Sequence, residues 1–176
     1  MSAYRDRLLR AIKLDPELYE EVEADKAATG QAILTVALSS LAAGVGGAIS
    51  GGWYGLLVNS AMAVVGWVVW AFLSYFIGTR LMPEPQTKAD IGELLRCTGF
   101  SSAPGLLMVF GFLPGLGNLI RFAVAVWMLA AFVVAVRQAL DYSSTLRAVA
   151  VCIIGWLVLI ALNAILFLAS LGRISL

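Results

Sequence analysis

Reactive and metal-binding side chains are sparse in this sequence. It has no histidine among its 176 residues, and its two cysteines, Cys97 and Cys152, lie far apart. Histidine is the most frequent general base and metal ligand at neutral pH, and zinc sites usually take cysteines in close pairs. We therefore predict a protein that is not an enzyme and has no metal site and no resident cofactor.

The remaining groups that could take part in chemistry lack their usual partners. Ser101 and Ser102 have no histidine to activate a hydroxyl, and the run Gly44–Gly47 lacks the following lysine of a phosphate-binding loop. Asp90 and Glu93 are three positions apart, so on a helix they share one side. This pair could hold a cation or an arginine of a partner, but we favour an ordinary solvated helix face.

The composition indicates a membrane protein. The chain is 61% hydrophobic and 13% charged, with a mean hydropathy of +0.91. A soluble domain is roughly 45–50% apolar and about 25% charged. We predict an all-α, polytopic helical bundle with five transmembrane helices in one membrane domain, residues 31–172. The expected spans are 31–50, 56–79, 101–114, 118–137 and 146–171.

The third expected span is the least regular. Residues 101–114 fall short of the about 20 apolar residues that a span usually needs, and they contain Pro104 and Gly105. The segment either crosses the membrane as a short helix or re-enters on the same side. We favour a crossing, because the polar turn 141–145 after the next span is flanked by arginines, as cytoplasmic loops often are.

The distribution of basic residues predicts the orientation. With five spans, ten of the 12 lysines and arginines lie on the side of the N-terminus, and only Arg121 and Arg173 lie on the other side. The positive-inside rule then places the N-terminus in the cytoplasm and the C-terminus outside. A re-entrant third segment gives the same ten-to-two count, so the count does not separate the two topologies.

Residues 1–30 are predicted to form a cytoplasmic arm. Tyr4, Leu8 and Ile12 recur at helical spacing among basic residues, which is typical of an amphipathic helix on a membrane surface. Asp15 followed by Pro16 favours the start of a second helix. We favour an arm that anchors the first span over one that forms a docking surface for a partner.

A second amphipathic surface helix is predicted between spans two and three. Thr87 and Asp90 resemble a capping box, and Ile91, Leu94 and Leu95 then share one face. We expect this helix to lie along the membrane before the third span begins.

Small residues spaced four apart predict close helix packing. They are Ser39, Ala43, Gly47 and Gly51 in and after the first span, and Gly111 and Gly115 in and after the third. Such spacing lets helices approach closely in lipid, and we favour packing within the chain over a homodimer. Asn163, deep in the last span, is predicted to bridge two helices by a hydrogen bond rather than to bind a polar ligand.

Four tryptophans lie away from the expected membrane interfaces. They are Trp67, Trp70, Trp127 and Trp156. We favour packing against helices or lipid. The alternative is a groove for a lipid tail, a quinone or a pigment, which would be held without histidine by apolar contacts or one hydrogen bond.

Three segments carry a family resemblance. They are Tyr19–Ala32, Leu94–Pro104 and Asp141–Ala148. Together they are similar to bacterial members of the Yip-domain family, in which a glycine–aromatic pair and a proline open the third span, here Gly99, Phe100 and Pro104. The resemblance implies a five-helix domain in the bacterial cytoplasmic (inner) membrane. Eukaryotic relatives bind small GTPases in vesicle traffic, and we do not transfer that role.

These observations predict a function through association. We expect a non-catalytic membrane scaffold or accessory subunit whose partners are membrane lipids and other membrane subunits or further copies of the chain. A net charge of +1 and the lack of a basic run predict no nucleic-acid partner. The alternative is a small transporter or channel whose path is lined by the glycine- and proline-broken third span.

Overall fold

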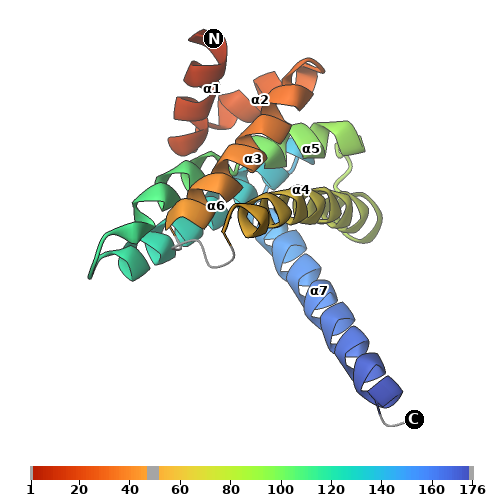
Figure 1. The fold of residues 1–176 in the computed structure, drawn as a ribbon. Coiled ribbons are helices and arrows are strands. Elements are labelled where there is room, and N and C mark those ends of the chain that lie inside the picture. Colours follow the sequence, from red (N-terminus) through yellow and green to blue (C-terminus); the bar gives the residue numbers. More distant parts are fainter. Residues whose placement is uncertain (1, 47–51, 175–176) are drawn as a thin grey trace.

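The fold was analysed in a computed structural model that describes residues 2–46 and 52–174. Within these ranges the chain is helical and has no strand (Figure 1). The elements are α1 (Ser2–Ile12), α2 (Pro16–Ala24), α3 (Ala28–Gly46), α4 (Gly52–Phe76), the π-helical turn η1 (Ile77–Leu81), α5 (Ile91–Phe100), the 3₁₀ helix η2 (Ala103–Phe112), α6 (Gly117–Ala139) and α7 (Thr145–Ile174).

Five segments are long and apolar enough to cross a membrane. They are Ala28–Val45, Tyr54–Leu81, Ile91–Phe112, Gly117–Ala139 and Thr145–Leu162. The all-α class and the five membrane-length helical segments are therefore confirmed. Gly47 and Gly51, two of the expected packing positions, lie outside the described residues.

The third apolar segment differs from its expected form. It begins at Ile91 rather than at residue 101, because α5 runs on through a short turn into η2. Its residues are the most buried of the five segments, and Leu94, Cys97 and Phe100 are fully buried. Of the residues expected on a membrane-surface helix, Leu94 therefore lies inside the bundle, whereas Ile91 at the helix start is exposed.

Polar groups of α5 are satisfied internally, which explains how it can be buried. The Arg96 side chain is 5% exposed, and its guanidinium donates to the carbonyl oxygens of Val22 (2.9 Å) and Glu23. The Thr98 hydroxyl donates to the Leu94 carbonyl. At the helix start, Asp90 and Glu93 form a reciprocal capping box, with N–H to oxygen distances of 3.0 and 2.7 Å.

The N-terminal arm is folded onto the bundle. Asp15 caps α2 by accepting a hydrogen bond from the Glu17 N–H at 3.0 Å, with Pro16 at the first helical position. Along α2, Leu18, Tyr19 and Val22 are fully buried. The apolar face of α1 packs on the same core through Tyr4, Leu8 and Ile12. The arm therefore belongs to the folded domain and is not a free extension of the first span.

Candidate functional site

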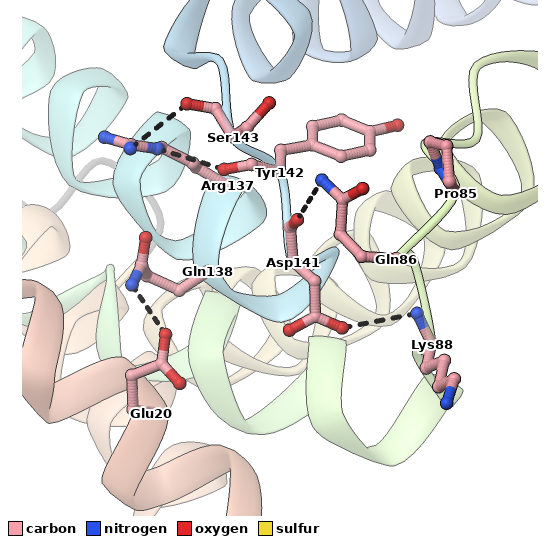
Figure 2. Close-up of a pocket in the computed structure, with 9 residues that line it drawn as sticks. All are labelled: Glu20, Pro85, Gln86, Lys88, Arg137, Gln138, Asp141, Tyr142 and Ser143. Carbon is pink, nitrogen blue, oxygen red and sulfur yellow. Dashed lines mark hydrogen bonds between the residues drawn. The ribbon is translucent and has the colours of Figure 1, made fainter.

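A polar pocket of about 640 Å³ lies where several spans end. The connection 82–90, which leads into α5, meets the turn 140–144 between α6 and α7, and α2 borders the same space. The lining residues are Glu20, Pro85, Gln86, Lys88, Arg137, Gln138, Asp141, Tyr142 and Ser143 (Figure 2). We call this space the polar pocket.

The turn after α6 has a defined backbone geometry. Asp141 has a φ of 53°, in the left-handed region, and a short polar side chain tolerates that conformation better than most. The Tyr142 N–H donates to the Arg137 carbonyl at 2.9 Å, and the Asp141 N–H donates to the Gln138 carbonyl at 2.8 Å. This is the Schellman arrangement, which satisfies the last carbonyls of the helix.

The Arg137 side chain stabilises this turn through hydrogen bonds. Its guanidinium donates to the Tyr142 carbonyl at 3.2 Å, to the Ser143 carbonyl at 3.3 Å and to the Thr145 hydroxyl at 3.2 Å. Figure 2 shows it lying against the turn on one side of the pocket. The end of α6 and the start of α7 are thereby held in one position.

Glu84 joins the two connections. Its carboxylate accepts hydrogen bonds from the Ser143 N–H (3.0 Å) and hydroxyl (2.8 Å) and forms an ion pair with Arg147 at 3.0 Å. Gln86 also donates to it. These bonds, the backbone N–H of Ser143 first, hold the pKa of Glu84 below its usual value. Glu84 is therefore an ionised group with a structural task.

Further bonds between the connections complete the floor of the pocket. The Gln86 amide donates to the Asp141 carbonyl at 3.1 Å, and the Lys88 N–H donates to the Asp141 carboxylate at 3.2 Å. The Tyr142 hydroxyl lies 2.8 Å from the Met82 carbonyl and 3.0 Å from the Gly78 carbonyl. Burial raises the pKa of Tyr142 to about 12, so the hydroxyl stays protonated and can donate.

The α2 side of the pocket carries acidic groups. The Gln138 amide donates to Glu20 at 2.7 Å, which ties α6 to α2. Nearby, Glu23 has one carboxylate oxygen that is buried without a hydrogen-bond partner in the described part of the chain. Burial, followed by repulsion from Glu93, Asp141 and Glu20, raises the pKa of Glu23 to about 7.

The pocket has the means to bind polar groups. Glu20 and Asp141 supply negative charge, and Lys88 and Arg137 supply positive charge, from three separate parts of the chain. Across residues 2–46 and 52–174, no cluster of three or more Cys, Asp and Glu side chains is arranged to hold a metal ion. The arrangement suits recognition by charge and hydrogen bonds.

The expected helix-packing residues fall in different surroundings. Ser39 and Ala43 line a second pocket, of about 460 Å³, between α3, α4, η2 and α6. The Ser39 hydroxyl donates to the Ser102 carbonyl at 2.6 Å. Gly111 is buried in η2, whereas Gly115 lies in the following turn with a φ of 77°, a conformation that glycine adopts without strain. Asn163 belongs to α7, but its side chain lies outside what the structure describes.

The four tryptophans do not gather in one groove. Trp67 lines the second pocket and donates its ring N–H to Thr98 at 3.0 Å. Trp70 packs edge-to-face on Phe132 with 5.7 Å between ring centroids. The Trp127 ring N–H donates to the Ile12 carbonyl at 2.9 Å and so contacts α1, while the Trp156 side chain is exposed on α7.

The residues of the family motif share one packing region. A Cβ placed on Gly99 would lie 2.6 Å from the Ala32 Cβ, so a glycine lets α5 and α3 approach closely. Phe100 is fully buried and meets Tyr4 edge-to-face at 6.4 Å between ring centroids. Pro104 is buried in the first turn of η2. These residues hold α1, α3 and α5 together.

Sequence reasoning did not find the buried charged groups. Glu84 and Arg96 stand beside apolar residues like any solvated residue of an amphipathic helix or connection. Arg96 donates to the Val22 carbonyl, and Glu84 accepts from the Ser143 N–H. Both partners are distant in sequence, so local spacing carries no signal for these contacts.

Comparison with known proteins places the chain in a family. The family model described as Yip1 domain matches residues 14–166, which is most of the chain. Among curated proteins and solved structures, the comparison found no match.

Proposed function

Because this chain belongs to the Yip1 domain family and is a membrane protein with apolar helices, we propose that it works as a non-catalytic scaffold or accessory subunit. It would act through helix–helix and lipid contacts in a larger membrane assembly. We further propose the inner membrane of a bacterium as its location, with the N-terminus and the polar pocket on the cytoplasmic side. The distribution of lysine and arginine supports this orientation.

The course of α7 carries the proposal. Its first half packs on the bundle, and at Gly155 an added Cβ would lie 2.9 Å from the Trp70 ring. Beyond that point α7 runs out of the bundle toward the C-terminus (Figure 1). The exposed apolar side chains of this part include Trp156, Leu157, Ile160 and Ile165. We call Trp156–Ile165 the outer α7 segment.

A membrane helix that leaves its bundle forgoes close packing with its own chain. In lipid, helices associate through van der Waals contact and hydrogen bonds, because the lipid gives little hydrophobic contrast. A partner helix against the outer α7 segment would restore those contacts. This supports association through α7, either with other membrane subunits or with a second copy.

Cysteine cross-linking in native membranes tests the proposal. Leu157 in the outer α7 segment and Leu129 on α6 are both leucines that are 59% exposed, so they form a matched pair. The native thiols of Cys97 and Cys152 are buried and should give little background. With a bismaleimide, Leu157→Cys should give a species of higher mass, and Leu129→Cys should give at least tenfold less. Equal yields, or monomer alone from both variants, would contradict association through α7.

The transporter alternative gains no support from the third segment. At Gly105, an added Cβ would lie 3.0 Å from the Met128 Sδ and 3.0 Å from the Ser39 Cβ. At Gly117, it would overlap the Gly111 carbonyl oxygen. Close contacts on both sides of η2 favour a packed helix over the wall of a water-filled path.

A further inference from the structure

The second pocket lies within the apolar segments. Its about 460 Å³ is bounded by α3, α4, η2 and α6, and every lining residue falls within the membrane-length ranges. Asn59 and Trp67 line it from the same helix, just over two turns apart, which corresponds to about 12 Å along the axis. Asn59 is near the beginning of the segment Tyr54–Leu81, and Trp67 is near its middle. The pocket therefore extends from near one membrane boundary toward the bilayer centre.

Most polar groups that border this pocket are already satisfied. The Ser39 hydroxyl donates to Ser102, the Ser40 hydroxyl donates to the Ala37 carbonyl at 2.8 Å, and the Trp67 N–H donates to Thr98. The Asn59 side chain is exposed, and within the described ranges no hydrogen bond joins its amide to another residue. An asparagine amide near the membrane boundary can donate a hydrogen bond to a polar group of a neighbouring lipid.

The deeper part of the pocket is apolar and adaptable. Met108 of η2 and Met128 of α6 line it beside the Trp67 ring. Methionine side chains are flexible and adjust to a chain of varying shape. The η2 backbone is a 3₁₀ helix of 10 residues, which is long for this helix type.

We propose that this pocket binds one acyl chain of a diester phospholipid, with the ester carbonyl accepting a hydrogen bond from the Asn59 amide. The polar contact lies near the membrane boundary and the apolar wall lies deeper, which is the order of groups along a phospholipid. The polar pocket lies toward the opposite ends of α4 and α6, so the lipid belongs to the leaflet away from the polar pocket. The inference does not rest on α7 or on the proposed association.

The test compares lipid retention in matched variants. Ala63→Phe places a ring in the pocket, and Ala61→Phe places the same ring on an exposed position of the same helix outside it. After reconstitution with diester phosphatidylglycerol and mild extraction, native mass spectrometry should show one retained lipid in the wild-type chain and in Ala61→Phe. Ala63→Phe should retain at least tenfold less. Equal retention in the two phenylalanine variants would overturn the proposal.

A second comparison tests the hydrogen bond and does not depend on how Ala63→Phe folds. A diether phosphatidylglycerol has the same headgroup and chains but no ester carbonyl. The wild-type chain should retain the diester lipid over the diether lipid, and Asn59→Leu should lose this preference while circular dichroism stays unchanged. Equal retention of both lipids by the wild-type chain, or displacement of the lipid by a quinone, would overturn the proposal.

Discussion

One charged side chain, Arg96, is buried where α2 meets α5. Arg96 donates to carbonyls in the last turn of α2, and cations are favoured at that end of a helix. Glu23 lies in the same region, with one carboxylate oxygen unpartnered in the described part of the chain. Burial and three further acidic groups, from α2, α5 and the turn after α6, raise the pKa of Glu23, and the Arg96 guanidinium opposes them. We therefore expect the contact between arm and bundle to depend on pH.

Removal of the Glu23 charge should therefore stabilise the protein at neutral pH. Its pKa is about 7 in the fold against 4.5 ordinarily, because burial and its acidic neighbours disfavour the anion. The folded protein therefore binds a proton at Glu23 more tightly than the unfolded chain does. Stability should fall as pH rises from about 4.5 to about 7 and then level off. In Glu23→Gln this decline should shrink, with a gain on the order of 1 kcal/mol above pH 7 after allowance for solvent screening.

Thermal unfolding in detergent at pH 5 and pH 8 measures this effect. Glu17→Gln is the control, since Glu17 is an exposed acid on the same helix. It should leave the pH dependence as it is in the wild-type chain. If Glu23→Gln shows the same decline as the wild-type chain, the burial of this carboxylate does not control the contact.

At the scale of elements, α5 sets the spacing of the bundle. It packs against α2, α3, α4 and α6. Because Gly99 has no side chain, α3 can approach α5 closely at this position. Gly99→Ala would bring a Cβ to 2.6 Å from the Ala32 Cβ and 3.1 Å from the Ala32 Cα. The helices must then separate, and we expect a loss of about 1–3 kcal/mol in the free energy of unfolding.

Gly66 in α4 supplies the control for this prediction. An added Cβ there meets nothing within 4 Å, so Gly66→Ala should be neutral or slightly stabilising. Titration with a denaturing detergent, followed by circular dichroism, compares the two variants. Equal transition midpoints for both alanine variants would show that Gly99 does not limit the approach of α5 to α3.

The elements also show where sequence reasoning succeeds. Asp15 and Pro16 predict the start of α2, because capping depends on residues next to one another in the chain. The five apolar segments can be predicted from the composition of the chain. The burial of α5 depends on Arg96 reaching α2, a contact between residues far apart in the chain. The two pockets arise where several elements meet. Residue spacing within one element therefore predicts neither that burial nor either pocket, although it does single out Trp67, Ser39 and Ala43, which line the second pocket.

At the scale of the whole molecule, Arg7 connects the arm to the first span. Its guanidinium donates to Glu21 and Asp25 of the α2 region, each at 2.8 Å, and to Gln31 of α3 at 3.0 Å. The Arg7 side chain is 12% exposed, so these charge-assisted bonds are partly shielded from solvent. One side chain thus joins three consecutive helical elements.

Loss of this connection should loosen the arm while the spans remain folded. In Arg7→Gln, amide hydrogen exchange over residues 2–24 should accelerate by about tenfold or more, equivalent to roughly 1.4 kcal/mol. Exchange in α6 should stay unchanged. Arg7→Lys should give an intermediate effect, because an ammonium group keeps the charge but cannot reach three acceptors as a planar fork does. Arg5→Gln, at an exposed position of the same helix, should match the wild-type chain. If Arg7→Gln accelerated exchange equally in the arm and in α6, the arm and the spans would unfold as one unit and the arm would have no separate docking equilibrium.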